Sequence, residues 1–276
     1  TGEYRGKIDA LAGAIDYLQK NRADYVVLAD GDLIANIDIS EVVQAHENGG
    51  NDITMVVTKK SADNPFTTYC ELNRKREIVD IRVGDNNDGK CKYSALGVYV
   101  MSRQYLIHLI ADCVTHNCIH FERELLTRAL NDSNIGAYVF NEYNTKVFDA
   151  KDYFQANMDI LDKDCRNELF LRTRPIFTRI YDEAPAYYGD QAEVCDSLVA
   201  DGCHIEGKVT NSVLFRDVLV EKDAEIKNSI IMENGRVLSG ASLAHIVLDR
   251  GVTIREGRTM MGHENYPVVI AKRSVV

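Results

Sequence analysis

The first part of the chain alternates between helix-like and strand-like patterns of apolar residues. Over residues 8–18 the apolar positions recur at three- and four-residue spacing, which predicts an amphipathic helix. The continuous apolar run over 25–29 predicts a strand that is buried on both faces. A helix capped by Ser40 and ending near residue 50 follows, and then a strand over 52–58. This strand-helix-strand order predicts a parallel sheet.

The remaining elements of this part follow from the same two periodicities. The basic segment Arg74-Lys75-Arg76 separates two short apolar runs and predicts a hairpin. Strands are expected over 69–73, 77–81, 95–101 and 136–140, and helices over 102–111, 120–131 and 150–162.

Beyond about residue 166 the helical periodicity disappears, so we expect two domains, over 1–165 and 166–276. Residues 211–215 are repeated 17 positions later at 228–232 and, more loosely, at 245–249. Apolar pairs six residues apart recur at the same interval: Cys203 and Val209, Val220 and Ile226, Val237 and Leu243, Ile254 and Met260. Three strands of about six residues per repeat predict a triangular β-helix of about four coils, with these apolar residues inside.

Charge and composition narrow the function. The 276 residues include 42 acidic and 32 basic side chains, for a net charge of −10, which disfavours nucleic acid and anionic membranes as partners. The chain has no apolar run long enough to cross a membrane, so we expect neither a membrane span nor a signal peptide, and its seven cysteines suit reduced thiols. We therefore expect a cytoplasmic protein. The first residue is Thr1 rather than methionine, so the N-terminus is interpreted as a cut.

The segment Asp30-Gly31-Asp32 is the sharpest local feature, because it follows a predicted buried strand. Ligands of open α/β sheets bind at the carboxyl ends of such strands, and paired carboxylates there hold Mg²⁺ against phosphate. The alternative is that Asp30 caps a helix and Gly31 permits the turn. Residues 4–10, at the start of the first helix, present N–H groups suited to a nucleotide, or form an ordinary helix start.

Four segments, in this order, resemble the ADP-glucose pyrophosphorylase family. They are Tyr4-Arg5-Gly6-Lys7-Ile8-Asp9-Ala10, Val26-Val27-Leu28-Ala29-Asp30-Gly31-Asp32, Gly97-Val98-Tyr99-Val100 and Tyr153-Phe154-Gln155-Ala156-Asn157-Met158-Asp159. The resemblance spans nearly the whole chain. It implies an α/β fold: a Rossmann-like, GT-A-like nucleotidyltransferase domain without its N-terminal part, followed by a left-handed parallel β-helix of hexapeptide repeats. It also implies the conversion of ATP and glucose 1-phosphate to ADP-glucose and diphosphate.

Within that family the chain is most similar to the paralogous GlgD-type subunit of glycogen biosynthesis, through Asn36-Ile37-Asp38 and residues 175–188. By the resemblance, Asp32 is one metal carboxylate, and Tyr4, Gly6 and Asp9 are nucleotide-binding candidates. Lys146 stands where the second metal carboxylate is expected, so binding of the family's Mg²⁺ is doubtful. Lys146 is also a candidate contact for a substrate phosphate.

Other family positions are altered too. The sugar-phosphate lysine falls in Val83-Gly84-Asp85, a family serine becomes Ala95, and Lys7 and Ile8 replace a threonine and an alanine. Residues 120–123 match a further family segment only loosely. About a hundred upstream residues, with the Gly-rich phosphate loop, are missing by comparison.

These departures imply a catalytically deficient, regulatory or stabilising subunit. Its partner would be the paralogous catalytic subunit, in a hetero- or homo-oligomer such as a tetramer, with ATP or a sugar phosphate as possible ligands. The alternative is an active glucose-1-phosphate adenylyltransferase. A purely structural oligomerisation partner is a further alternative.

Three other clusters carry competing interpretations. Cys113, His116, Cys118 and His120 suggest zinc, against ordinary helix-end and loop residues, which the spacing favours. An acyltransferase of the hexapeptide-repeat type is suggested by His204, His245 and His263, but none of them lies in an evident insertion between coils. Arg172, Arg174 and Arg179 are candidates for binding an anionic effector, against a solvated linker.

Overall fold

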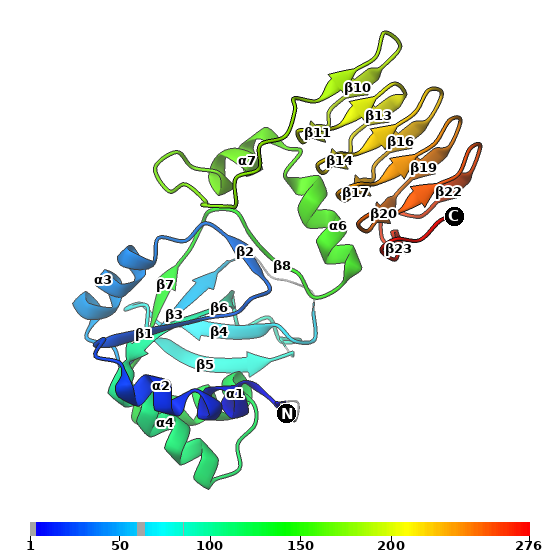
Figure 1. Ribbon diagram of the computed structural model, residues 1–276. Coiled ribbons are helices and arrows are strands. Elements are labelled where there is room, and N and C mark those ends of the chain that lie inside the picture. The colour runs from blue at the N-terminus through cyan, green and yellow to red at the C-terminus, as the bar shows by residue number, and fades with distance from the viewer. Residues whose placement is uncertain (1–3, 60–63, 85) are drawn as a thin grey trace. The chain divides into compact units, whose positions relative to one another are not determined.

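The computed structural model describes residues 4–59, 64–84 and 86–276 (Figure 1). The chain divides into two compact units, of which the first runs to Leu33 and resumes over Ile37–Glu142. The second comprises Ile34–Asn36 and Tyr143–Val276. Among the described residues, none of the helices combines the length and the apolar composition that crossing a membrane requires.

A mixed sheet forms the centre of the first unit. Its strand order is β5-β4-β6-β3-β7, and β1 pairs with the part of β6 that β4 leaves open. The strands are β1 (Tyr25–Ala29), β3 (Ile53–Thr58), β4 (Thr68–Leu72), β5 (Ile78–Val83), β6 (Tyr93–Ser102) and β7 (Ile135–Val139). The hairpin predicted around residues 74–76 is confirmed, because β4 and β5 pair antiparallel.

The prediction of a parallel sheet built from β1 and β3 is wrong in its pairing. Both strands pair antiparallel with β6, so they run in the same direction but have β6 between them. The pairing of β3 with β7 is parallel. The sequence pattern could not show this, because β6 comes later in the chain and enters the sheet between two strands that a helix joins. Accordingly, β1 is half-buried rather than buried on both faces.

Helices cover both faces of this sheet. Alternate residues of β3, Ile53, Met55 and Val57, belong to the large apolar core shared with α1 (Lys7–Gly13), α2 (Ile15–Lys20), α4 (Arg103–Thr115) and the π-helical turn η1 (Phe121–Leu126). The turn η1 leads into α5 (Thr127–Asp132). On the opposite face, Thr54 of β3 contacts His46 of α3 (Ile39–Gly49).

Two helix boundaries differ from the prediction. The first predicted helix is two short helices, because the chain leaves helical geometry at Ala14. The N-cap of α3 is Asp38 rather than Ser40, since the Asp38 carboxylate accepts the N–H groups of Ser40 and Glu41. Both residue types cap helices well, so the pattern alone does not decide between neighbouring candidates.

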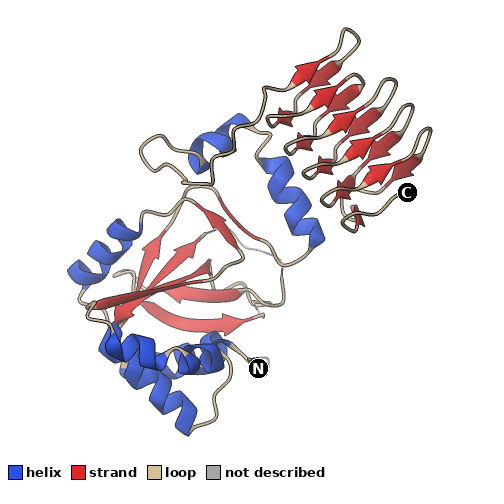
Figure 2. Ribbon diagram, in the orientation of Figure 1, coloured by secondary structure: helices blue, strands red, loops and turns tan. Residues whose placement is uncertain are grey.

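The second unit contains the predicted β-helix, and Figure 2 shows its short strands stacked coil upon coil. Each of its three faces is a parallel sheet of five strands, and together they form about four turns. The strands are β9 (Tyr187–Tyr188), β10 (Glu193–Cys195), β11 (Leu198–Val199), β12 (His204–Ile205), β13 (Lys208–Thr210), β14 (Val213–Leu214), β15 (Leu219–Val220), β16 (Glu225–Lys227), β17 (Ile230–Ile231), β18 (Arg236–Val237), β19 (Ser242–Ala244), β20 (Ile246–Leu248), β21 (Thr253–Ile254), β22 (Thr259–Met261) and β23 (Val268–Ile270).

The 17-residue interval holds for most coils but not for the one that contains Cys203. Strand β13 pairs with β16 at an interval of 17, whereas β10 pairs with β13 at an interval of 15, as Glu193 and Lys208 show. This coil is two residues shorter because the connection between β12 and β13 is shorter. Val220 therefore stacks on Ile205, and the predicted stacking of Val220 on Cys203 is wrong by two positions. Cys203 is nevertheless buried.

Polar side chains also stack along one corner of the β-helix. Asn211, Asn228 and His245 all have positive φ, and Asn211 donates a 2.7 Å hydrogen bond to Asn228. The Asn228 amide in turn donates to His245 Nε2 at 3.3 Å. Next to this column, the buried Ser212 hydroxyl accepts the N–H of Ser229. The Ser212 bond satisfies a backbone N–H at the corner, and the amide and imidazole bonds link the side chains of successive coils.

Two helices and a small strand pair complete the second unit. Helix α6 (Ala150–Asp159) packs on the β-helix through Phe154, which contacts Ile230 and Val247. Helix α7 (Lys163–Leu169) is capped by Asp162. Strand β2 (Leu33–Ala35) pairs with β8 (Asn144–Lys146).

Candidate functional site

A lysine lies between two carboxylates at the carboxyl end of β1. Lys7 Nζ is 2.7 Å from Asp30 Oδ1 and also contacts Glu122 Oε1. Both carboxylates are mostly shielded from solvent, and the Lys7 side chain is 43% exposed. Burial lowers the pKa of Lys7, but its bonds to Asp30 and Glu122 outweigh that effect and the net pKa is raised. The three groups therefore form one cluster, in which two carboxylates share a single ammonium.

Residues of strand β6 contact both carboxylates of this cluster. The backbone N–H of Asp30 donates to the carbonyl of Gly97 at 3.0 Å, and the Asp30 carboxylate lies against the same glycine. The Tyr99 hydroxyl donates to Glu122 at 3.3 Å. Burial, and then the charges of Glu122 and Asp30, raise the pKa of Tyr99 well above its usual value. Tyr99 thus stays a neutral hydrogen-bond donor at every ordinary pH.

Asp32, the predicted metal carboxylate, follows in the turn between β1 and β2. Its side chain is half-buried and its Oδ1 is shielded from solvent. The lysine cluster involves Asp30 and not Asp32. The alternative interpretation of Asp30 as a helix cap is wrong, because its carboxylate binds Lys7 and the next helix, α3, is capped by Asp38.

The three nucleotide-binding candidates lie at the start of α1, and one of them already has a partner. Tyr4 is 68% exposed. Gly6 is the N-cap of α1 and lies so close to Ile119 that a β-carbon would be 2.5 Å from the Ile119 carbonyl oxygen. The Asp9 carboxylate accepts hydrogen bonds from the Arg5 guanidinium, at 2.8 Å for the shortest. This ion pair lowers the pKa of Asp9.

The remaining phosphate and effector candidates belong to the second unit. The Lys146 ammonium lies 5.9 Å from the centre of the Phe148 ring. Arg174 donates to the carbonyl of Asn36, and the Asn36 amide donates to the carbonyl of Arg174 at 2.9 Å, so this arginine has a structural role. Arg172 is exposed, and Arg179 lies 5.0 Å from the Tyr181 ring.

The altered family positions in the first unit are partly described. Val83 ends β5, and Gly84 follows it with positive φ. Asp85 lies outside the described residues. Ala95 is buried within β6.

The cysteine and histidine cluster does not converge on a metal. Cys113 and Cys118 are buried next to each other, and Arg128 donates to the Cys118 sulfur at 3.3 Å. Burial and the neighbouring Cys118 raise the pKa of Cys113 to about 12. His116 contacts Asp112, and His120 is exposed. Within the part of the chain that the structure describes, no group of three or more His, Cys, Asp or Glu side chains could hold a metal ion.

The three β-helix histidines each have different contacts. His204 stacks on Tyr187 and lies 3.0 Å from Glu206, and His245 belongs to the corner column. The expectation that none lies in an insertion is wrong for His263. Val247 pairs with Val269 at an interval of 22 rather than 17, and His263 begins the longer connection. His263 accepts the N–H of Asn265 through Nδ1.

Sequence reasoning missed the partnership of Lys7 with Glu122. Lys7 appeared only as a substitution for a family threonine, and Glu122 only in a loosely matching segment. The available signal was the charge itself, because a lysine placed next to Asp30 needs carboxylates to compensate its burial.

An α/β region with a central sheet, followed by a hexapeptide-repeat β-helix, defines the fold class of this protein. Residues 184–266 match the family described as "GlmU-like, C-terminal hexapeptide". The chain is 29% identical over 230 residues to the glucose-1-phosphate adenylyltransferase of Geobacillus stearothermophilus, which covers 81% of this chain and 59% of the relative.

Two further relatives agree with this. The chain is 25% identical over 273 residues to the glucose-1-phosphate adenylyltransferase of Bacillus thuringiensis, covering 97% of the chain and 72% of the relative. It is 27% identical over 269 residues to that of Acetivibrio thermocellus, covering 96% of the chain and 63% of the relative. The curated homologues of this chain are thus glucose-1-phosphate adenylyltransferases, and the chain spans between 59% and 72% of their length.

Proposed function

We propose that the chain is a cytoplasmic, catalytically deficient subunit of an ADP-glucose-forming glucose-1-phosphate adenylyltransferase in glycogen biosynthesis. It would regulate or stabilise a paralogous catalytic subunit in an oligomer, as a GlgD-type subunit does. The homology to glucose-1-phosphate adenylyltransferases over most of the chain supports the family activity of the complex.

The proposal that the subunit is catalytically deficient rests on the position of Lys7. Transfer of a nucleotidyl group depends on Mg²⁺ to neutralise phosphate oxygens, and carboxylates hold that ion. Here the Lys7 ammonium already lies 2.7 Å from Asp30 and contacts Glu122. A divalent cation that used Asp30 or Glu122 as a ligand, beside the predicted metal carboxylate Asp32, would have to displace this ammonium from the same oxygens.

The residues present do not fit a resident Mg²⁺. Asp32 is half-buried, and Asp30 is paired with Lys7. Lys146 stands, by resemblance, where a second carboxylate is expected. No acidic group of three converges within the described ranges. We therefore derive no catalytic step through the metal.

The test is a pyrophosphorolysis assay of the full-length subunit alone, of the active paralogue alone, and of their mixture. We expect the subunit alone to be at least about a hundredfold slower than the paralogue, since each lost transition-state donor alone costs about 3–4 kcal/mol. We expect the mixture to respond differently to effectors than the paralogue does. Activity of the subunit alone at the level of the paralogue would favour the alternative, an active enzyme.

Regulation in this proposal involves two exposed arginines. Arg172 and Arg179 are proposed to contact an anionic effector, whereas Arg174 is held by Asn36. In the mixed complex, Arg172→Ala should weaken the effector response, and Arg22→Ala serves as a control for loss of one exposed charge. An unchanged response in Arg172→Ala and Arg179→Ala would exclude this role. A purely structural partner would change assembly alone and leave every effector response unaltered.

A further inference from the structure

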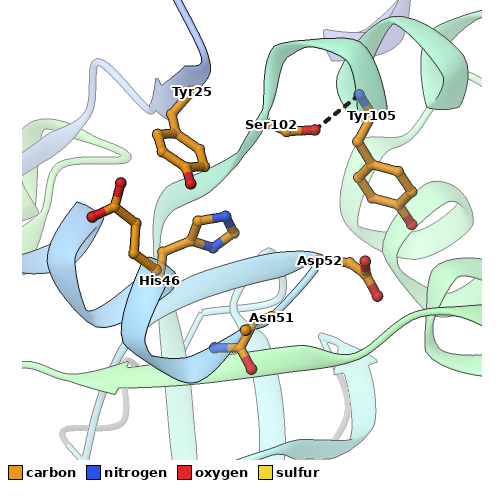
Figure 3. Close-up of a pocket in the computed structure, with 8 residues that line it drawn as sticks. Tyr25, His46, Asn51, Asp52, Ser102 and Tyr105 are labelled. Carbon is orange, nitrogen blue, oxygen red and sulfur yellow. Dashed lines mark hydrogen bonds between the residues drawn. The ribbon is translucent and has the colours of Figure 1, made fainter.

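Helix α4 has a regular cap at each end, and two cysteines meet at the second one. At the start of the helix the Ser102 hydroxyl accepts the N–H of Tyr105, the bond that Figure 3 marks with a dashed line. At its end, the N–H of Cys118 donates to the carbonyl of Cys113 at 2.9 Å. Asn117, directly before Cys118, has a positive φ of 54°. A left-handed residue followed by a six-to-one hydrogen bond is the Schellman motif, in which the side chains of the two bonded residues commonly touch.

The backbone bond also limits how far apart the two cysteines can be. With standard backbone dimensions, a 2.9 Å bond from the Cys118 N–H to the Cys113 carbonyl places the two Cα atoms no more than about 6.8 Å apart. Disulfides span Cα separations of about 4.4–6.8 Å. The end of α4 therefore brings these cysteines within bonding range while both are reduced.

The two thiols face each other inside the apolar core of the first unit. Cys113 is 2% exposed and Cys118 is 8% exposed. Burial, and then the neighbouring Cys118 thiol, with which Cys113 shares a hydrogen bond, raise the pKa of Cys113 to about 12. The hydrogen bond between the thiols agrees with the contact that the Schellman motif predicts.

A cationic side chain contacts one of the two sulfurs. The Arg128 guanidinium donates to the Cys118 sulfur at 3.3 Å, and Cys118 is the less buried of the two cysteines. Thiol–disulfide exchange proceeds by attack of a thiolate, and a guanidinium is a permanent cation that stabilises such an anion. Cys118 is therefore suited to be the attacking sulfur, and Cys113 to be the second one.

We propose that Cys113 and Cys118 form a reversible disulfide, so that the end of α4 is a site of redox modification. The oxidant is a small disulfide such as oxidised glutathione. The Cys118 thiolate attacks one sulfur of this molecule, a mixed disulfide forms, and the first glutathione leaves and takes up the proton that Cys118 lost. Cys113 then attacks the Cys118 sulfur, and the second glutathione leaves with the Cys113 proton. Two protein thiols and one small disulfide thus become one protein disulfide and two small thiols.

The modified segment leads into the Lys7 cluster. The carbonyl of Ile119, the residue after Cys118, lies against Gly6, and Glu122, which contacts Lys7, follows in η1. A disulfide removes conformations from the unfolded chain, so oxidation should stabilise this connection. The proposal is independent of the catalytic state of the chain, and transient disulfides of this kind occur even in reducing compartments.

Mass spectrometry of the full chain in a glutathione buffer tests the site. Trypsin cleavage after Arg103 and Arg123 leaves both cysteines in one peptide, 104–123, which the disulfide makes two hydrogen atoms lighter and inert to iodoacetamide. We expect the disulfide in more than half of the molecules at about 1 mM each of oxidised and reduced glutathione, because two thiols in contact have an effective concentration above millimolar. The measurement starts both from the reduced folded chain and from chain refolded out of urea, so that slow access to buried thiols does not decide the result.

Substitutions distinguish the roles of the two cysteines. In Cys113→Ser, glutathione should remain attached to Cys118, whereas Cys118→Ser should leave Cys113 unmodified in the folded chain. Arg128→Gln should slow oxidation of the folded chain several-fold. Cys195→Ser, which removes an exposed cysteine of the second unit, is the matched control and should oxidise at 104–123 as the unaltered chain does.

A peptide 104–123 that stays fully reduced from both starting points would overturn the proposal. A disulfide that joins Cys113 or Cys118 to a different cysteine of the chain would overturn it as well. Oxidation of Arg128→Gln at the rate of the unaltered chain would show that the guanidinium does not assist the attack by Cys118.

Discussion

The carboxylate of Asp30 fills the space beside Gly97 that a side chain would occupy at any other residue. A β-carbon on Gly97 would lie 2.1 Å from Asp30 Oδ2, and the φ of Gly97 is +78°. Both the missing side chain and the left-handed backbone are therefore needed for Asp30 to reach Lys7.

Replacing this glycine should displace Asp30 from Lys7. We expect Gly97→Ala to lower the free energy of unfolding by at least about 2 kcal/mol, because the backbone is strained and the carboxylate must move. Gly31→Ala is the matched control, since a β-carbon there meets no atom within 4 Å, and it should change stability little. Urea unfolding measures both. Equal stability of the two variants would contradict the close packing of Asp30 on Gly97.

Removing the lysine should turn the cluster into a site that gains from a divalent cation. In Lys7→Thr, Asp30 and Glu122 lose their shared cation, and we expect a loss of about 1–2 kcal/mol, moderated because Lys7 is partly exposed. Added Mg²⁺ should then raise the melting temperature of the variant more than that of the unaltered chain.

Arg5→Thr is the control for this experiment. Arg5 binds Asp9, outside the cluster, so Mg²⁺ should act on Arg5→Thr as it does on the unaltered chain. If Lys7→Thr responds to Mg²⁺ no more than Arg5→Thr does, the lysine is not standing in for a metal charge.

The buried serines Ser212 and Ser229, which accept backbone N–H groups of the next coil, should be essential to the stability of the β-helix. The Ser229 hydroxyl accepts the N–H of Ile246 at 3.1 Å and donates to the carbonyl of Lys227 at 2.7 Å. Ser229→Ala leaves the Ile246 N–H without its acceptor, whereas the Lys227 carbonyl keeps the N–H of His245, and should cost about 1–3 kcal/mol in chemical unfolding. Ser242→Ala, at a half-buried position of the same turn with no such bond described, should cost clearly less; the reverse order would argue against this role.

One member of the corner column is suboptimal, and correcting it should stabilise the protein. His245 Nε2 accepts from Asn228, so its hydrogen is on Nδ1, which is buried and has no partner among the described residues. His245→Asn would continue the pattern of Asn211 and Asn228, and asparagine tolerates positive φ. We expect a gain of about 1 kcal/mol in the free energy of unfolding. A loss of stability would mean that packing of His245 on Phe154 outweighs the unpaired N–H.

The protonation of His46 should make the first unit sensitive to acid. Burial lowers the pKa of His46 in the folded state below the ordinary value of about 6.5. Its contribution to stability is thus complete above about pH 6.5 and is lost as the pH falls toward the folded-state pKa, because the unfolded chain binds the proton more readily. Between pH 7.5 and 5.5, urea unfolding of His46→Phe should depend on pH less than unfolding of the unaltered chain. An identical pH dependence would show that His46 does not contribute.

The sequence predicted those parts of the fold that depend on local periodicity. The hairpin around residues 74–76, the helix that became α4 and the inward residues of the β-helix all follow from the spacing of apolar side chains. The position of β6 between β1 and β3 did not, because strand order depends on contacts between residues 36 to 77 positions apart along the chain. The 15-residue coil was hidden because Cys203 is buried next to the true ladder residue, Ile205.

The sequence predicted the location of the candidate site better than it predicted which residues pair there. Resemblance directed attention to the turn after β1, where the cluster indeed lies. It emphasised Asp32, whereas the ion pair involves Asp30. Which of two carboxylates separated by one residue faces a lysine depends on the conformation of the turn and on the room beside Gly97. Neither property is visible in a linear pattern.

The shortened coil between β12 and β13 shows where the β-helix tolerates a change of chain length. At this corner Gly207 lies close to the next coil, so close that a β-carbon would be 2.4 Å from the Ala224 carbonyl oxygen, yet the strands on all three faces keep their pairing. The faces, and not the number of residues per coil, define the repeat. Changes of chain length in this solenoid therefore fall at its corners, with two residues fewer between β12 and β13 and five more between β22 and β23, while the stacked interior keeps its register.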